Sequence, residues 1–424
     1  MEATSSQLFV LKITARKIQI KLFFALIISL CFTGFGFSQG AKLTPLDVKS
    51  NIEKLDRNIM GFSADIPRRY SMEKYVPPVS DQGDTSACVG FSALYYSLST
   101  MYNITFGYTS YQDRFANAFD PYFLYSILNN YKDDACDEGL YVYEAVEKIN
   151  SIGAKKRWIS PITKCNTNWS NSDISRVKKY TYPFRIDAFY DIPPKEVEVI
   201  KEAIYNDMPV TGLFALTDSF DSERGWYGGE SRKGLWNPGN SEQINGYHAM
   251  TLVGYDDFVF GGSFRVVNSW GDDYGDEGYL WIPYDVFVKK CEEAYAYSVD
   301  FEKNINSTND EFERYDNDDG VYEGEYINND LNGYATWYSF EAKTYYFGFL
   351  NKGSWDGFHV VITPDELKYG EMTNGYFNEY GFADEENLEK ERDLKEYFDL
   401  FDIKNITLNK IRKANSTKKM PTKR

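Results

Sequence analysis

One cysteine of this 424-residue chain stands where a thiol could act as a nucleophile. Cys88 opens the stretch 88–101, which can form a helix whose inner side consists of Phe91, Leu94 and Tyr95. A thiol attacks a carbonyl carbon as the thiolate, and the dipole and free N–H groups of a helix N-terminus favour that charged form. Three preceding residues could cap the helix: Asp84, Thr85 and Ser86.

A thiol nucleophile needs a neighbouring base, and the chain has two histidines, His248 and His359. His359 lies in a repeated segment, at the position that Ala335 and Ala383 hold in the other repeats, so we expect a surface or packing role. His248 begins a run typical of a buried strand, and Asn268 ends the next such run. If these strands are adjacent, the neutral amide of Asn268 could hold the imidazole of His248 in one tautomer.

Two further side chains could complete a site for acyl transfer. Gln82 stands shortly before Cys88, and its amide could donate to an oxyanion together with the Cys88 N–H. Trp270 follows Asn268 closely, and its indole could shield the contact between His248 and Asn268 from water. A cysteine, a histidine and an orienting amide are the parts of nucleophilic catalysis through a thioester.

Five motifs, in this order along the chain, resemble those of the papain-like cysteine peptidases, the C1 family. They read Gln82-Gly83, Cys88-Val-Gly-Phe-Ser-Ala93, His248-Ala249 with Val253-Gly254-Tyr255, Asn268-Ser269-Trp270-Gly271, and Gly275-Asp-Glu-Gly278-Tyr279. The chain order and the separations of the cysteine, the histidine and the asparagine also agree with the family. The resemblance spans about residues 65–300.

The resemblance implies an α+β fold of two lobes. A helical lobe would be led by the Cys88 helix, and a β-barrel-like lobe would carry His248 and Asn268. The implied activity is hydrolysis of peptide bonds in protein or peptide substrates through this Cys-His-Asn triad and a covalent thioester. No metal or cofactor is required. Supporting roles would fall to Gln82 at the oxyanion, Trp270 over the triad, and Ala249 and Leu213 in a substrate pocket.

The chain departs from the family pattern around the nucleophile. The family often has Cys-Gly-Ser-Cys-Trp, whereas residues 85–89 read Thr-Ser-Ala-Cys-Val, so the upstream cysteine of the usual disulfide is absent. Cys136, in a turn similar to the family's Cys-x-Gly-Gly, loses that partner; we expect it to pair with Cys165, the alternative being two free cysteines. Cys291 is expected to be buried or free.

Residues 39–81 show no long helical pattern, so no helical inhibitory prodomain is expected.

Two other functions stay open. A papain-like scaffold without activity could bind peptides, although such relatives usually lose the nucleophile or the base, and both are present here. A thiol acyl transferase would share the acyl-enzyme step and pass the acyl group to an amine instead of water.

Residues 1–38 resemble a secretory signal peptide. A basic region, with Lys12, Arg16, Lys17 and Lys21, precedes the apolar run 22–37. Cleavage after Ser38 would leave Gln39 first and deliver a secreted, periplasmic or cell-envelope protein. The alternative is an uncleaved membrane anchor.

The C-terminal part of the chain changes character. Residues 304–319 are polar and acidic and predict a linker. Residues 320–383 repeat with a period of about two dozen residues, with aromatic residues around Asn-Gly and Asp-Gly turns, which predicts stacked β-hairpins. They resemble the MORN repeat family, whose arrays could bind a protein partner or the envelope surface; the alternative is a buttress for the main domain. Residues 384–424 predict a helix and a basic tail.

Composition narrows the function further. The net charge of −17 excludes a generic nucleic-acid binder, which needs a basic surface. Five cysteines are too few for a disulfide scaffold. The predicted organisation is a signal peptide (1–38), a short N-terminal segment (39–64), a papain-like peptidase domain (65–303), an acidic linker (304–319), MORN-like repeats (320–383), and a helix with a basic tail (384–424).

Overall fold

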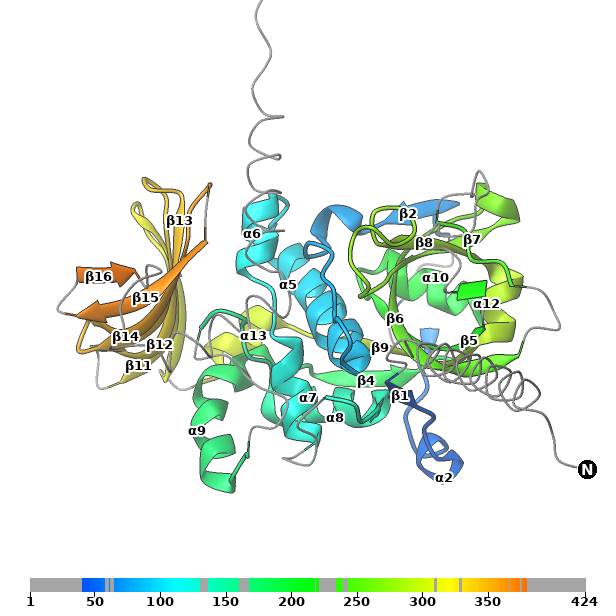
Figure 1. Ribbon diagram of the computed structural model, residues 1–424, viewed down its shortest axis with the longest axis horizontal. Helices are drawn as coiled ribbons and strands as arrows, with labels where there is room; N and C mark the ends of the chain where they lie inside the picture. Colours follow the sequence, from blue (N-terminus) through cyan, green and yellow to red (C-terminus); the bar gives the residue numbers. More distant parts are fainter. Residues whose placement is uncertain are drawn as a thin grey trace, which may run out of the picture. The chain divides into compact units, whose positions relative to one another are not determined.

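The computed structural model describes most of the chain between Gly40 and Glu379 (Figure 1). The described ranges are 40–57, 61, 65–129, 136–159, 168–217, 219–220, 234–238, 243–308, 311–327, 330–365, 367–373 and 376–379. Three predicted features lie outside them: the signal peptide, Cys165, and the helix with the basic tail of 384–424. Within these ranges, no helix has the length and apolar character needed to cross a membrane.

A helix that is buried on all sides runs through the helical lobe. It consists of α4 (Cys88–Gly90), a π-helical segment η2 (Phe91–Leu98) and α5 (Ser99–Thr105). Every residue from Cys88 to Leu98 is buried, as expected for a helix that is apolar on all its faces. The predicted inner residues are therefore buried. The further helices of the lobe are α6 (Tyr111–Ala116), α7 (Pro121–Asn129), α8 (Val142–Ile152), α9 (Asn171–Thr181) and the 3-10 turns η1 (Glu73–Tyr75) and η3 (Tyr182–Phe184).

A seven-stranded sheet forms the second lobe. Its strands follow the order β4-β9-β5-β6-β7-β8, and β2 also pairs with β6. These strands are β2 (Arg69–Ser71), β4 (Ala188–Asp191), β5 (Val210–Thr217), β6 (Ile244–Asp256), β7 (Ser263–Val267), β8 (Tyr279–Pro283) and β9 (Cys291–Ser298). The lobe also holds α10 (Val197–Tyr205), α12 (Tyr284–Lys290) and the turn η4 (Val259–Gly261).

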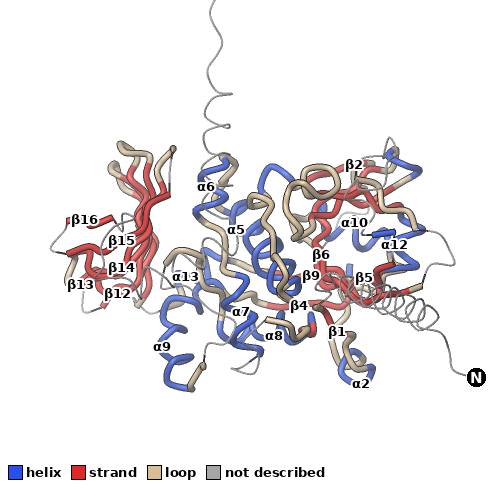
Figure 2. Tube along the Cα trace, in the orientation of Figure 1, coloured by secondary structure: helices blue, strands red, loops and turns tan. Residues whose placement is uncertain are grey.

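Burial explains why these segments form strands. All eight residues of β5 are buried, and so is β6 from His248 to Tyr255, as the apolar run after His248 predicted. All pairings in this sheet are antiparallel. Helices predominate between Cys88 and Phe184, and antiparallel strands predominate between Ala188 and Glu379 (Figure 2), which confirms the predicted α+β class.

The C-terminal sheet is an antiparallel meander of seven strands in chain order. Its strands are β10 (Phe312–Asp316), β11 (Gly320–Ile327), β12 (Asp330–Ser339), β13 (Thr344–Asn351), β14 (Ser354–Ile362), β15 (Leu367–Thr373) and β16 (Tyr376–Glu379). Gly324, Gly348 and Gly370, one from each of the three repeats, lie in one row across the sheet. In this row Ala335 pairs between the first two glycines and His359 between the last two. A side chain at Gly348 would overlap the ring of His359, so the small residues of the row make room for the histidine.

The predicted linker 304–319 is largely ordered. It contains the end of α13 (Phe301–Asn306) and all of β10, which pairs with β11. The polar sequence had predicted irregular structure. It forms a strand all the same, because a strand at the edge of a sheet needs few apolar residues. Here Phe312 is buried, and Arg314 turns toward the helical lobe, where it is bound by tyrosine hydroxyls and a carboxylate.

A buried charged cluster fixes the C-terminal sheet to the helical lobe. We call Glu323, Lys156, Arg314 and Tyr102 the Glu323 cluster. Glu323 of β11 forms an ion pair with Lys156 and accepts a hydrogen bond of 2.8 Å from the Tyr102 hydroxyl of α5. The Arg314 guanidinium lies 3.6 Å from the same carboxylate. Because both ion-pair partners are buried, the sheet is joined to the lobe by a contact that excludes water.

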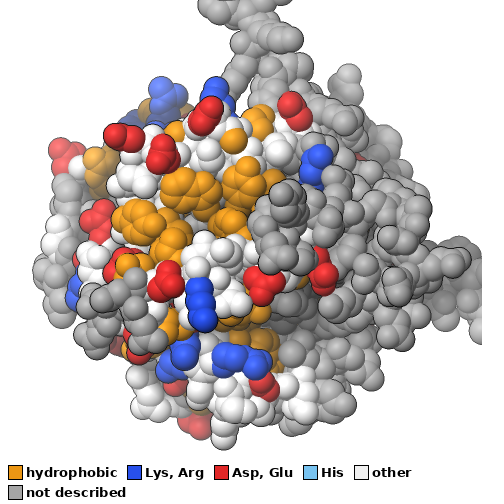
Figure 3. Space-filling view, turned by 90° about the vertical axis from the view of Figure 1, so that its left-hand side faces the viewer, with side chains coloured by type: hydrophobic (Ala, Val, Ile, Leu, Met, Phe, Trp, Pro, Cys, Tyr) orange, Lys and Arg blue, Asp and Glu red, His pale blue; other side chains and the backbone are white. Residues whose placement is uncertain are grey.

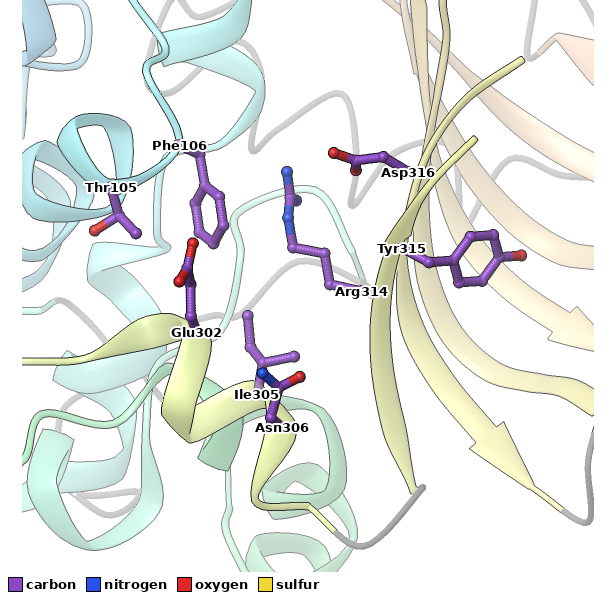
Figure 4. A pocket seen from close by; sticks show the side chains of 8 residues that line it. All are labelled: Thr105, Phe106, Glu302, Ile305, Asn306, Arg314, Tyr315 and Asp316. Carbon is purple, nitrogen blue, oxygen red and sulfur yellow. The ribbon is translucent and has the colours of Figure 1, made fainter. Parts of the chain in front are cut away.

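A cavity of about 470 Å³ lies beside this cluster (Figure 4). Its walls come from the end of α5, from α13 and from β10: Thr105, Phe106, Glu302, Ile305, Asn306, Arg314, Tyr315 and Asp316. The guanidinium of Arg314 stacks over the ring of Phe106, 4.0 Å from its centroid. The cavity therefore belongs to the junction between the lobe and the sheet.

The opposite face of the C-terminal sheet carries hydrophobic side chains at its centre and charged side chains around them (Figure 3). A hydrophobic cluster of this sheet has Tyr322, Ala335 and Leu350 as its buried residues. Partly buried residues pack against it: Tyr315, Leu331, Trp337 and Trp355.

Candidate active site

Cys88 is the first residue of α4 and is fully buried. The helix cap differs from the expectation, because the N-cap is Ala87 and no side chain caps the helix. Two of the three expected caps are engaged elsewhere: the Thr85 hydroxyl donates to the Gln82 carbonyl, at 2.7 Å, and the Ser86 hydroxyl donates to the Asp137 carbonyl, at 2.8 Å. These bonds hold the turn that leads into the helix.

His248 and Asn268 meet across neighbouring strands. His248 lies in β6, and Asn268 directly follows β7, which pairs with β6. The distance between His248 Nε2 and Asn268 Oδ1 is 2.7 Å. The backbone N–H of Ser269 also donates to Asn268 Oδ1, at 2.8 Å, which identifies this atom as the amide oxygen. His248 therefore donates from Nε2, and its Nδ1 is left as the acceptor.

This remaining nitrogen of His248 has no hydrogen-bond partner among the described residues, although the side chain is fully buried. The next residue, Ala249, brings its backbone amide against the Cys88 thiol, so β6 passes directly over the nucleophile. A buried imidazole nitrogen that has no partner is chemically able to accept a proton.

Gln82 is fully buried between the Cys88 turn and the strand end that carries Asn268. Its Oε1 accepts from the Ser269 hydroxyl, at 2.5 Å, and its Nε2 donates to the Thr85 carbonyl, at 2.6 Å. A side-chain amide has two N–H donors, so one stays available for an oxyanion. The sequence did not assign Ser269 a role, although it lies between Asn268 and Trp270 in the same motif.

Trp270 packs over the histidine. The two ring centroids are 5.0 Å apart with an angle of 43° between the planes. Phe220 touches both rings, with centroid distances of 5.1 Å to Trp270 and 6.2 Å to His248. Nothing in the local sequence around Phe220 pointed to this position, because its partners are distant in the chain.

Burial controls the charges of the two reactive groups. It raises the pKa of the Cys88 thiol to about 11, although backbone N–H groups of Ala249 and Gly40 stabilise the thiolate and lower it. Burial lowers the pKa of His248 to about 4, although the hydrogen bond with Asn268 raises it. In this conformation both groups are neutral near pH 7, so burial outweighs the helix N-terminus that the sequence suggested.

The two predicted pocket residues lie side by side. Leu213 of β5 pairs with Ala249 of β6, and both are buried. On its other side Leu213 pairs with Glu293 of β9, so one row of the sheet runs from Ala249 through Leu213 to a carboxylate. Glu293 is 1% exposed. No motif marked Glu293, although an acidic residue directly before a run of alanine and tyrosine in a strand is an available signal.

The cysteines partly follow the expectation. Cys136 is disulfide-bonded, and Cys88 and Cys291 are free and buried. Because Cys165 lies outside the described residues, its pairing with Cys136 stays a prediction.

Comparison with known proteins decides the family. Residues 64–301, more than half of the chain, match the sequence model described as papain family cysteine protease. The chain belongs to the papain family. The description of this family is that of cysteine proteases.

Individual relatives of this papain-family chain are distant. An uncharacterized peptidase C1-like protein of Acanthamoeba polyphaga mimivirus is 25% identical over 218 residues, which cover 48% of this chain and 63% of that relative. Xylellain, a cysteine protease from Xylella fastidiosa, is 17% identical with a TM-score of 0.48, over 62% of this chain and 96% of its own. A digestive procathepsin L2 proteinase from the larval midgut of Tenebrio molitor is also 17% identical with a TM-score of 0.48, over 70% of this chain and 95% of its own.

Proposed function

We propose that the protein is an exported cysteine peptidase that hydrolyses peptide bonds with Cys88, His248 and Asn268. The observation that carries this proposal is the hydrogen bond of 2.7 Å between His248 Nε2 and Asn268 Oδ1, in a buried site where the strand of the histidine covers the thiol. It fixes the imidazole tautomer whose Nδ1 can accept the thiol proton.

In the first half of the reaction, Cys88 Sγ attacks the scissile carbonyl carbon and its proton passes to His248 Nδ1. The oxyanion that forms accepts from the Cys88 N–H and from the free N–H of the Gln82 amide. His248 then protonates the leaving nitrogen, the C–N bond breaks, and a thioester remains on Cys88.

In the second half, His248 takes a proton from a water molecule, which attacks the thioester carbonyl. The C–S bond breaks, the carboxylic acid product leaves, and the thiol regains its proton. Asn268 acts throughout as a positioning residue, and Trp270 keeps water from its hydrogen bond with His248. No step draws on a metal or a cofactor.

Hydrolysis of a mixed fluorogenic peptide library by the full-length protein tests this proposal. We expect turnover that disappears in Cys88→Ala and persists in Cys291→Ala, the matched change at a second free and buried cysteine of the described residues. Protein whose Cys88 reacts with iodoacetamide but whose turnover does not depend on Cys88 would contradict the proposal. Addition of an amine acceptor separates hydrolysis from acyl transfer, because a transferase would yield the amide instead of the acid.

Export is proposed from the basic and apolar pattern of residues 1–38. Detection of Gln39 as the N-terminal residue of secreted protein would support it.

For the C-terminal sheet we propose a buttressing role, because the Glu323 cluster joins it to the helix that carries Cys88. A MORN-type contact with a protein partner or the envelope surface stays a prediction.

A further inference from the structure

Two consecutive tyrosines of the π-helical segment η2 hold the chain that leads to the oxyanion glutamine. The Tyr95 hydroxyl donates to the Pro78 carbonyl, at 2.7 Å. The Tyr96 hydroxyl accepts from the Ser80 N–H, at 3.1 Å. Both tyrosines are 1% exposed, and their rings meet edge to face with centroids 5.0 Å apart. The segment just before Gln82 is therefore attached to the helix of the proposed nucleophile.

Tyr96 also reaches the residue that orients the histidine. Its hydroxyl donates to the backbone carbonyl of Asn268, at 2.9 Å, and the Ser80 carbonyl is a more distant acceptor, at 3.3 Å. Burial raises the pKa of Tyr96 well above its ordinary value, so the hydroxyl keeps the proton that it donates. One hydroxyl thus accepts from the Gln82 side of the candidate site and donates to the Asn268 side.

The side chain of Asn268 is held at its oxygen. Oδ1 accepts from His248 and from the Ser269 N–H, whereas Nδ2 has no hydrogen-bond partner among the described residues. The backbone of Asn268 is held at both polar atoms, because its N–H donates to the Gly278 carbonyl, at 3.0 Å, and its carbonyl accepts from Tyr96. A shift of this carbonyl therefore moves the amide that holds the imidazole.

The two segments that Tyr96 joins also contact each other. Asp81 forms an isolated antiparallel bridge with Trp270, and the Gln82 N–H donates to the Ser269 carbonyl, at 2.8 Å. Residues 80–82 and 268–270 therefore run side by side as a short antiparallel pair. Tyr96 lies across this pair, because it bonds to one residue of each segment.

The helix makes Tyr96 a rigid link to the nucleophile. Tyr96 follows Cys88 by eight residues, and every residue between them is buried. A closely packed interior leaves such a helix little room to move. π-helical turns are rare and occur frequently at functional sites. The position of Asn268 relative to the Cys88 thiol therefore depends on one buried element and one hydroxyl.

We propose that Tyr96 is a positioning residue, which couples the helix of the nucleophile to the asparagine that orients the base. This inference rests on the proposed peptidase function. The Tyr96 hydroxyl touches no reacting atom. It acts through Asn268, so that His248 keeps the orientation in which its Nδ1 can take the thiol proton. No motif marked Tyr96, because its two partners lie far apart in the sequence.

The test compares Tyr96→Phe with Tyr95→Phe in the full-length protein. Each change removes one buried hydroxyl from the same helix, but only the first removes a bond to Asn268. We expect kcat for peptide hydrolysis to fall roughly threefold to tenfold in Tyr96→Phe at unchanged KM, as the loss of one hydrogen bond predicts. Tyr95→Phe should keep the wild-type kcat. In an Asn268→Ala background, Tyr96→Phe should cause no further fall, since the two residues act through one contact.

A second readout does not need turnover. The chain has two histidines, so protein labelled with isotopic histidine gives NMR signals from two imidazoles, and His248→Phe assigns them. The Nε2 proton of His248 should exchange with water severalfold faster in Tyr96→Phe and at the wild-type rate in Tyr95→Phe. Both variants should lower Tm by only about 5 °C, so measurements well below Tm use folded protein.

The outcomes separate the positioning role from the peptidase function. Faster proton exchange in Tyr96→Phe alone, with no hydrolysis even by the wild type, would support the positioning role and contradict the peptidase. Wild-type exchange and turnover in Tyr96→Phe would overturn the positioning role and leave the peptidase standing. Equal losses in the two tyrosine variants would also overturn it, because a general loosening of the helix would then explain both.

Discussion

Loss of one charge in the Glu323 cluster should destabilise the whole protein and not only its C-terminal sheet. The perturbation is Glu323→Gln, which keeps the size of the side chain and an oxygen that can accept from the Tyr102 hydroxyl. It removes the negative charge that faces Lys156 and Arg314. The two cations would then share a buried space with no carboxylate.

The magnitude follows from burial. The side chains of Lys156 and Glu323 are 1% and 3% exposed. Removing one partner of a buried ion pair typically costs about 3–5 kcal/mol of unfolding free energy, which corresponds to roughly 10 °C in Tm for a domain of this size. Burial already lowers the pKa of Lys156 to about 8 in the presence of Glu323. Without the carboxylate this pKa falls further, and loss of the proton limits the cost.

The assay is urea unfolding of the full-length protein, followed by tryptophan fluorescence. Asp285→Asn is the control, because it breaks an exposed pair with Lys289 and should change the free energy by less than about 0.5 kcal/mol. The double variant Lys156→Met/Glu323→Leu should recover most of the loss, since it replaces the pair with apolar groups. A Glu323→Gln protein within about 1 kcal/mol of the wild type would refute the reasoning.

Two further predictions concern the candidate site. Asn268→Ala should lower kcat roughly tenfold to a hundredfold and leave KM unchanged, because it removes the bond that orients His248 and no contact with substrate; a change confined to KM would contradict the positioning role. The unfolding free energy should also fall by about 3 kcal/mol as the pH drops from 6.5 to 4. Over this range the unfolded His248 gains a proton, whereas the folded one, with its pKa lowered to about 4, begins to gain it only at the acidic end. Denaturant unfolding at several pH values should show this slope in the wild type and not in His248→Phe; equal slopes would exclude it.

The local sequence pattern was sufficient to predict elements whose formation depends on residues that are neighbours in the chain. The Cys88 helix follows from an apolar sequence, and the strand of His248 follows from a buried run, so the sequence predicts the two elements and the α+β class. The meeting of His248 with Asn268 depends on one pairing, that of β6 with β7, which the motif spacing suggested. The position of Trp270 against His248 follows from the same pairing.

Features that depend on distant contacts could not be predicted. The predicted side-chain cap of the Cys88 helix was wrong, because the hydroxyls of Thr85 and Ser86 donate to the carbonyls of Gln82 and Asp137. Only the fold brings Asp137 close to Ser86. Glu293 lies in the pocket row because β9 pairs with β5, which are far apart in the sequence. Thr44, whose N–H donates to Glu293, is even more distant in the sequence and lies near the start of the described residues.

The Cys88 helix connects the candidate active site to the C-terminal sheet. Its first residue is the proposed nucleophile, and its last segment, α5, carries Tyr102, which donates to Glu323 of the C-terminal sheet. This helix is buried from Cys88 to Asn103, and a packed interior transmits displacement instead of absorbing it. A change that loosens the Glu323 cluster should therefore shift the helix that positions Cys88. Glu323→Gln at a temperature where the protein is still folded should lower turnover as well as stability, which a peripheral module would not do.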